Sequence, residues 1–193
     1  MHKKGLSKVL IANRGEIAVR ICRTLKEMGI ASVAVYSDAD RNSQHVGAAD
    51  EAVALGGQTA AESYLRSELI LQAAKDTGAQ GIIPGYGFLS ENADFAEACA
   101  EAGIRFIGPT PDQLRRFGLK HEARALAEAA GVPLAPGTGL LQNLGEAKSA
   151  AADIGYPIML KSTAGGGGIG LSRCDNEQQL VDAFESVKRM GEN

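Results

Sequence analysis

Short apolar runs alternate with longer amphipathic stretches along most of the chain. The first run, Lys8–Ala12, reads KVLIA, and the segment Gly15–Met28 follows it. In that segment Ile17, Ile21, Leu25 and Met28 recur at a spacing that places them on one face of an α-helix. The pattern predicts a buried strand followed by an amphipathic helix whose apolar face packs against it.

The same alternation continues through the first half of the chain. It predicts strands at Ser32–Tyr36, near Ala52–Leu55, at Gln80–Pro84 and at Ile104–Ile107, and helices at Arg66–Thr77 and Glu91–Ala102, the second capped by Ser90. Strands that alternate with helical stretches of about 10–15 residues are typical of βαβ units and a parallel sheet. We therefore predict the α/β class, with a Rossmann-like doubly wound parallel sheet over residues 1–116.

A second unit is predicted over residues 117–193. Its helices are Lys120–Ala130, Leu144–Ile154 and Glu177–Met190, and its strands are Pro157–Ser162 and the segment near Gly170–Arg173. Asn143 and Glu146 have the spacing of a capping box, which indicates where the second of these helices begins.

A glycine-rich segment, YPIMLKSTAGGGGIG at Tyr156–Gly170, connects the two strands of this second unit. Because a strand follows it, and not a helix, the segment is neither a P-loop nor a dinucleotide-binding fingerprint. Glycine backbone N–H groups can form a concave site for phosphate, and Lys161 would add a positive charge beside it. The alternative is a mobile hairpin with a solvated lysine.

Composition narrows the class of protein. The net charge of −3 and the scattered basic residues argue against a nucleic-acid partner. No apolar run approaches the roughly 20 residues that a membrane span requires. Cys22, Cys99 and Cys174 are widely spaced, which favours small core residues in a reducing, cytoplasmic compartment over disulfides or a metal site.

Three stretches carry a resemblance to a known family. The segment YPIMLKSTAGGGGIG resembles ATP-grasp enzymes, whereas IANRGEIAVRICRTLKEMGI and PGYGFLSENADFAEAC resemble biotin carboxylases in particular. Ile83, Ile169 and the stretch FGLKHEAR at 117–124 depart from the pattern of acyl-CoA carboxylases in the direction of urea carboxylases.

The resemblance implies a pre-ATP-grasp domain followed by the first part of an ATP-grasp domain. It implies carboxylation of biotin that depends on MgATP and bicarbonate, with ATP, Mg²⁺ and biotin as cofactors and a homo-oligomeric enzyme. Biotin would be carried on a separate biotinyl domain. Lys120 and Lys161 would contact ATP, and Gly165, Gly166, Gly167 and Gly168 would form the lid over its phosphates.

Two loops are candidates for the wall of the active site. Strand ends at one edge of a parallel sheet are where such folds bind ligands. Candidate residues at these ends are Asn13, Arg14, Glu16, Gly85, Tyr86, Glu91 and Asn92. For the first loop the alternative, which we favour slightly, is strand-to-helix geometry together with an ion pair.

The resemblance also implies that the catalytic groups and the Mg²⁺ ligands lie beyond Asn193. We therefore expect the chain to be the N-terminal portion of a larger carboxylase that converts urea to allophanate, and to be inactive alone. The alternatives are a component of an acyl-CoA or guanidine carboxylase, and a non-catalytic Rossmann-like module that serves as an assembly surface.

Overall fold

The computed structural model of the chain describes residues 5–162 and 170–190. The chain divides into two units, Met1–Leu114 and Arg115–Asn193, each with its own packing.

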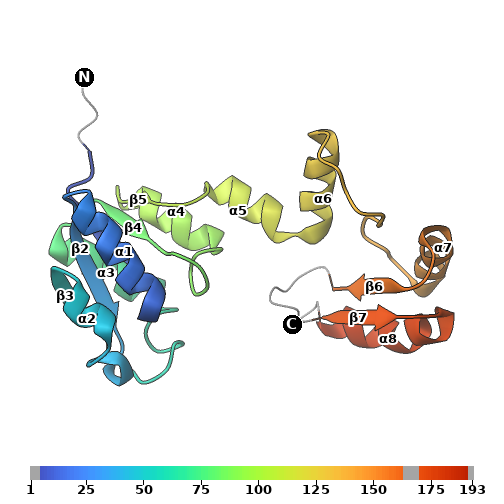
Figure 1. Cartoon of the computed structure of the whole chain (residues 1–193), viewed down its shortest axis with the longest axis horizontal. Coiled ribbons are helices and arrows are strands. Elements are labelled where there is room, and N and C mark those ends of the chain that lie inside the picture. The colour runs from blue at the N-terminus through green and yellow to red at the C-terminus, as the bar shows by residue number, and fades with distance from the viewer. Residues whose placement is uncertain (1–4, 163–169, 191–193) are drawn as a thin grey trace. The chain divides into compact units, whose positions relative to one another are not determined.

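The first unit contains a five-stranded sheet in which every pair of neighbouring strands is parallel (Figure 1). Its strands are β1 (Lys8–Ile11), β2 (Ala31–Tyr36), β3 (Glu51–Ala54), β4 (Gly81–Ile83) and β5 (Arg105–Phe106), in the spatial order β3-β2-β1-β4-β5. The chain first builds outward from β1 through β2 to β3, and then continues on the other side of β1 with β4 and β5. The order therefore reverses between β1 and β4, and the predicted doubly wound parallel sheet is confirmed.

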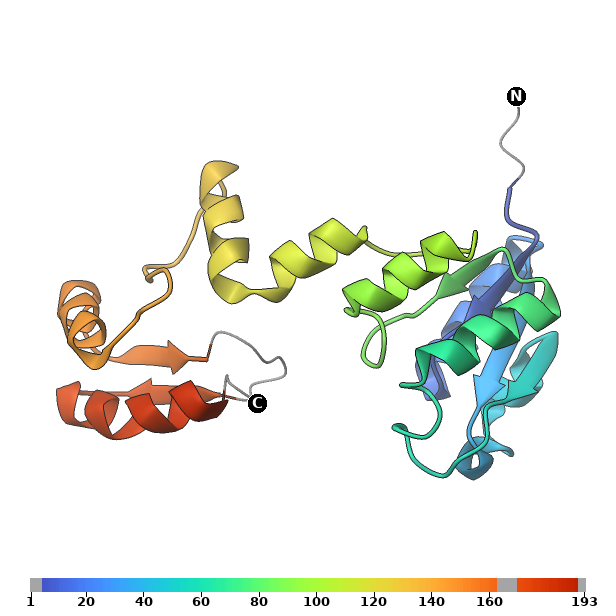
Figure 2. The same cartoon turned by 180° about the vertical axis from the view of Figure 1, so that it is seen from behind.

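Helices cover both faces of this sheet. Successive side chains of a strand point to opposite faces, so an apolar strand presents apolar side chains on both. Val9 and Ile11 of β1 pack with the buried face of α1 (Gly15–Glu27). Leu10, between them, belongs to the opposite core, which also contains residues of α3 (Ser67–Thr77) and α4 (Ala93–Glu101). Helix α1 lies in front of the sheet in Figure 1, and α3 lies in front when the molecule is seen from behind (Figure 2). Burial on both faces explains why β1 is an unbroken apolar run.

The described part of the second unit contains an antiparallel hairpin and, after α5 (Pro111–Gly118) at its start, three helices. The hairpin strands are β6 (Ile158–Lys161) and β7 (Leu171–Cys174), and the helices are α6 (Lys120–Ala129), α7 (Leu144–Ile154) and α8 (Glu177–Met190). Helices α7 and α8 share a core with the inward side chains of the hairpin, including Ile158 and Leu160. At the start of α7, Asn143 Oδ1 accepts a hydrogen bond of 3.0 Å from the backbone N–H of Glu146, as predicted.

Three short elements were not predicted. They are the 3₁₀ turn η1 (Asp38–Asp40), helix α2 (Gln44–Ala48) and helix α5 (Pro111–Gly118), which lies at the division between the units. The first two fall within a polar segment, SDADRNSQHVGA, that has no helical apolar period. Their conformation depends on contacts with the rest of the unit, which a local pattern does not contain.

Two details of the predicted helices are wrong. Helix α4 begins at Ala93, and its cap is Asn92, whose Oδ1 accepts a hydrogen bond of 2.8 Å from the N–H of Phe95; Ser90 is not the cap. Met28 lies past the end of α1 and is exposed, so the apolar face of that helix ends at Leu25.

The three cysteines are buried and unpaired, which confirms their assignment as core residues. Burial raises the pKa of the Cys99 thiol to about 11, so this thiol stays protonated at neutral pH. Among the described helices, none combines the length and the apolarity that crossing a membrane requires.

Candidate functional site

Asn13 lies at the point where the strand order of the first unit reverses. It follows β1, its side chain is almost completely buried, and its Nδ2 donates hydrogen bonds to the carbonyl oxygens of Pro84 and Tyr86, both at 2.7 Å. Those two residues belong to the loop that follows β4. Open parallel sheets bind ligands in the crevice between these two loops. In this unit the amide of Asn13 spans that crevice and joins its two sides.

Gly85 makes this close approach possible. Its φ of +67° lies in the left-handed region, and a Cβ at this position would lie 3.2 Å from Asn13 Nδ2 and 3.2 Å from Ile17 Cγ1. Glycine is therefore required at position 85 both for its backbone conformation and for the space it leaves.

Tyr86 and Glu16 fasten the loop after β4 to the first turn of α1. The Tyr86 hydroxyl donates a hydrogen bond to the Glu16 carboxylate, and this bond raises the pKa of Tyr86. The ring of Tyr86 is largely exposed, at 60%. The Glu16 carboxylate lies at the N-terminus of α1, where the helix dipole favours a negative charge. Of the proposed wall residues, Tyr86 is the one aromatic side chain, and it is exposed to solvent.

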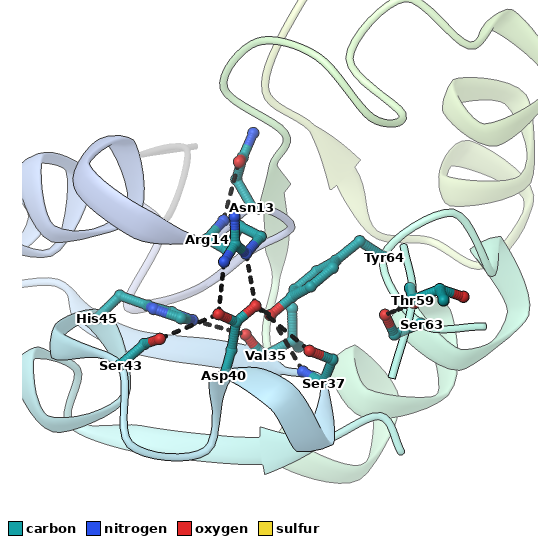
Figure 3. A network of polar contacts seen from close by, with 10 residues as sticks. All are labelled: Asn13, Arg14, Val35, Ser37, Asp40, Ser43, His45, Thr59, Ser63 and Tyr64. Atoms are coloured by element: carbon teal, nitrogen blue, oxygen red, sulfur yellow. Dashed lines mark hydrogen bonds and ion pairs between the residues drawn. The ribbon is translucent and has the colours of Figure 1, made fainter. Parts of the chain in front are cut away.

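Arg14 is engaged in an ion pair that the sequence analysis allowed for but did not locate. Its Nε and Nη2 atoms lie 2.5 Å and 2.6 Å from the two carboxylate oxygens of Asp40 (Figure 3). The hydrogen bond from Arg14 holds the pKa of Asp40 well below its usual range. Asp40 was missed because it falls in the polar segment after β2. The only local signal is that Asp40 lies in the loop that follows β2, at the same sheet edge as Arg14, and Asp38 in the same loop shares that signal.

The remaining wall candidates lie before α4. Asn92 is used as the helix cap, and Glu91 is exposed in the turn beside it. The contacts of Asn92 are therefore those of a structural residue, and Glu91 has no described partner that would hold it toward the loop of Tyr86.

The second unit brings the two candidate lysines to the base of the glycine-rich segment. Lys161 is exposed at the end of β6, where it pairs with Leu171. Lys120, at the start of α6, donates a hydrogen bond of 3.2 Å from Nζ to the carbonyl oxygen of Ser162, the residue next to Lys161. The backbone N–H of Ser162 in turn donates to the carbonyl of Gly170 at 2.8 Å and closes the hairpin there. Gly165, Gly166, Gly167, Gly168 and Ile169 lie outside the described residues.

One face of the β6–β7 hairpin carries apolar side chains that are exposed and that no described helix of this unit covers. Met159 and Leu171 are 49% and 43% exposed, whereas Ile158 and Leu160, which alternate with Met159 and Lys161 along β6, belong to the core. The uncovered apolar surface therefore adjoins Lys161. Neither Met159 nor Leu171 was predicted as a site residue, although the alternation along β6 and β7 separates them from the residues that face the core.

The described ranges, 5–162 and 170–190, contain no group of three His, Cys, Asp or Glu side chains that could hold a metal ion.

Two family models match successive parts of the chain. The model for the N-terminal domain of biotin carboxylase matches residues 5–114, which is more than half of the sequence. This chain belongs to the biotin carboxylase family. The model for the ATP-binding domain of the carbamoyl-phosphate synthase L chain matches residues 120–192. The family and the fold inferred from the three stretches of sequence are thereby confirmed.

Individual relatives of this biotin carboxylase chain are consistent with the family assignment. Urea amidolyase from Saccharomyces cerevisiae is 60% identical over 190 residues, which cover 98% of the chain but only 10% of that relative. The crystal structure of Kluyveromyces lactis urea carboxylase is 65% identical over 69% of the chain and 12% of its own length, with a TM-score of 0.67. The biotin carboxylase domain dimer of Hydrogenobacter thermophilus 2-oxoglutarate carboxylase, in complex with MgADP, ADP and bicarbonate, is 45% identical. It has a TM-score of 0.89 and is matched over 96% of the chain and 41% of its own length.

Proposed function

We propose that this chain is the N-terminal region of a biotin-dependent carboxylase, and that its second unit contributes to the ATP site. The observation that carries the proposal is the hydrogen bond from Lys120 to Ser162, which places a second lysine at the base of the glycine-rich segment beside Lys161. Two ammonium groups next to a segment of glycine backbone are suited to a polyphosphate.

The uncovered face of the hairpin completes this site. Met159 and Leu171 offer an apolar surface on which an adenine ring can lie, next to the exposed Lys161. The lysines would offset the charge that develops on a transferred phosphoryl group, and Gly165, Gly166, Gly167 and Gly168 would close over it. Mg²⁺ would be held by carboxylates of the complete carboxylase other than the described residues of this chain, and the biotin that accepts the carboxyl group would be carried on a separate biotinyl domain.

We further propose urea as the final acceptor of the carboxyl group, in a reaction that yields allophanate. The support is the identity of 60% to a urea amidolyase and of 65% to a urea carboxylase, together with the departures from acyl-CoA carboxylases at Ile83 and Ile169. The alternatives are guanidine and acyl-CoA acceptors. The chain spans about a tenth of the length of the urea amidolyases it matches. The acceptor is therefore assayed on the assembled enzyme, meaning the complete carboxylase that contains this chain. ADP release is measured with urea, guanidine, acetyl-CoA and propionyl-CoA in turn; stimulation by urea supports the proposal, and stimulation only by another acceptor overturns it.

Substitution of the lysines tests the ATP site. In the assembled carboxylase, Lys161→Ala and Lys120→Ala each remove a cation from the phosphates, and a charge-assisted hydrogen bond is worth about 1.5–3 kcal/mol. We expect the Kd for ATP, measured by calorimetry, to rise by about tenfold or more for each variant. Lys148→Ala is the matched control, because Lys148 forms an exposed ion pair with Glu177 on α8.

A Kd that stays at the wild-type value in both lysine variants would contradict the ATP site. That result would favour the second candidate, a non-catalytic module that serves as an assembly surface.

The assembled enzyme is proposed to be a cytoplasmic homo-oligomer that works with a biotinyl domain and bicarbonate. The support is the dimeric, bicarbonate-bound biotin carboxylase domain among the similar structures and the three unpaired cysteines of this chain. Light scattering on the assembled enzyme measures its oligomeric state, and a monomer would contradict this part of the proposal.

A further inference from the structure

Asp40 connects two loops of the first unit that lie far apart in sequence. Its Oδ2 accepts a hydrogen bond of 2.7 Å from the hydroxyl of Tyr64, in the loop after β3, and its carboxylate also pairs with Arg14, in the loop after β1 (Figure 3). Ser43 and Ser37 donate further hydrogen bonds, of 3.0 Å and 3.3 Å, to the same carboxylate. Asp40 is buried; its contacts with Tyr64 and Ser37 are buried as well, whereas those with Arg14 and Ser43 are partly buried.

The Tyr64 arm of this network ends on the loop after β4. The rings of Tyr64 and Phe88 are stacked, with centroids 5.0 Å apart and an interplanar angle of 12°. Phe88 has a φ of +44° and is, among the residues that the structure describes, the one non-glycine residue with a positive φ. A bulky residue in that region is strained, and such strain persists only where surrounding contacts hold it. The stacked ring of Tyr64 is such a contact.

The Arg14 arm ends on the same loop. Arg14 is the direct neighbour of Asn13, whose amide holds the carbonyls of Pro84 and Tyr86. The backbone N–H of Arg14 also donates to Asn13 Oδ1 at 2.9 Å, which fixes the orientation of that amide. Both arms therefore start at Asp40 and converge on residues 84–88, one at each end of this short segment.

We propose that Asp40 is a positioning residue that, through Arg14 and Tyr64, holds the loop 84–88 in the conformation that presents Tyr86 at the carboxyl edge of the sheet. The proposal rests on the proposed function in one respect, namely that this loop forms part of the wall of the carboxylase site. Loss of the network moves the loop and so lowers turnover. Binding of ATP stays intact, because the proposed ATP-binding lysines belong to the other unit.

Two variants and a matched control test this role. Asp40→Asn keeps the size of the side chain but removes the charge that pairs with Arg14. Tyr64→Phe removes the hydroxyl that donates to Asp40 and keeps the ring that stacks on Phe88. Asp38→Asn, in the same 3₁₀ turn, is the control, because Asp38 pairs with Arg41 in an exposed ion pair outside the network.

The first measurement is hydrogen exchange on the whole chain, which requires no activity. We expect peptides that cover residues 84–92 to exchange about tenfold faster in Asp40→Asn, and to a smaller extent in Tyr64→Phe, because the loop opens locally. Peptides from α1 and α3 should keep wild-type exchange, and Asp38→Asn should match wild type throughout. Unchanged exchange of residues 84–92 in a folded Asp40→Asn, or equal acceleration across the first unit, would overturn the proposal.

The second measurement is turnover of the assembled carboxylase. We expect kcat of bicarbonate-dependent ATP cleavage to fall about tenfold or more in Asp40→Asn, since misplaced active-site groups cost rates of this order, with the KM for ATP within about twofold of wild type. A KM for ATP that rises as much as kcat falls would contradict a role confined to the loop. If Asp40→Asn does not fold, Tyr64→Phe decides, by the same two criteria. If the wild-type enzyme shows no such turnover, the proposed function fails, while the exchange measurement still decides the role of Asp40.

Discussion

His45 is a fully buried titratable side chain on α2, in the loop region that also contains Asp40. Its Nε2 lies 3.2 Å from the carbonyl oxygen of Val35, and its Nδ1 has no hydrogen-bond partner among the described residues. Burial lowers the pKa of His45 from its ordinary value, because a charged imidazolium would lose its hydration there. The ring is therefore held in its neutral form.

The stability of the first unit should depend on pH through this residue. The unfolded chain binds the proton at a pKa of about 6.5, above the folded value, so the full stability is present above that pH. Stability then decreases as the pH falls below it, by at most about 1.4 kcal/mol per pH unit. Urea denaturation between pH 7.5 and 5 measures this slope.

His45→Gln is the matching variant, since its amide can still donate to Val35 but does not titrate in this range. A slope between pH 6.5 and 5 that is the same in His45→Gln and in wild type would rule out His45 as its source.

Asp40 affects the stability of the first unit at lower pH. Because its pKa is depressed in the folded state, its contribution is present above about pH 4 and is lost as the carboxylate is protonated below that value.

Some single-residue features could be predicted from the sequence and others could not. The burial of Cys99 and the cap at Asn143 follow from local pattern, and both were predicted. The stretch LSEN before α4 offers two capping residues, Ser90 and Asn92, and only the point at which the helix can pack decides between them. Asp40 was missed for a related reason: its partners Arg14 and Tyr64 lie 26 and 24 residues away along the chain.

At the scale of elements, the loop after β4 provides a matched pair of glycines. Gly85 and Gly87 both have left-handed backbones, with φ of +67° and +69°, so alanine strains the backbone at either position. A Cβ at Gly85 would also press on Asn13 and Ile17, whereas a Cβ at Gly87 meets nothing within 4 Å.

We expect Gly85→Ala to lower the free energy of unfolding more than Gly87→Ala does. Backbone strain contributes on the order of 1 kcal/mol to each variant, and overpacking adds about 1–3 kcal/mol for Gly85→Ala alone. Chemical denaturation of the two variants side by side measures the difference. Equal losses would mean that Asn13 and Ile17 give way at little cost, and that the loop is less tightly held than its contacts indicate.

The elements themselves were predictable where their side chains are buried in a regular pattern. Strand β1 is buried on both faces and was recognised from its unbroken apolar run, and α1 is buried on one face and was recognised from its helical period. The elements η1 and α2 have few apolar residues and take their conformation from the network around Asp40 and from the packing of His45 under β2. For them the local sequence contains no sufficient signal.

For the whole molecule, the core clusters follow the division into two units. Ile70 belongs to a cluster whose described members all come from the first unit, and Leu180 to one whose described members all come from the second. Both side chains have no exposed surface. We expect Ile70→Ala and Leu180→Ala each to destabilise its own unit by about 2–5 kcal/mol.

Hydrogen exchange of the whole chain distinguishes the two effects. Ile70→Ala should accelerate exchange in the first unit and leave α8 unchanged, and Leu180→Ala should do the reverse. Acceleration of both units by either variant would show that they unfold as one cooperative structure.

The sequence predicts the class of the molecule better than its arrangement. Alternation of strands and helices is sufficient to predict a parallel sheet. The strand order β3-β2-β1-β4-β5 depends in addition on the side of β1 on which β4 is added after β3. That choice is made by long-range packing. The same holds for the candidate ATP site, where the approach of Lys120 to Ser162 joins positions 42 residues apart.

The side chain of Asn13 has a consequence for the design of inhibitors. Compounds that target dinucleotide-binding enzymes place a pyrophosphate against the turn after the first strand, where glycines leave room for it. In this chain that room is taken by an amide that already uses both of its N–H donors on Pro84 and Tyr86. We therefore expect such compounds not to bind at this turn. A screen for selective ligands is better directed at the exposed hairpin surface formed by Met159, Lys161 and Leu171.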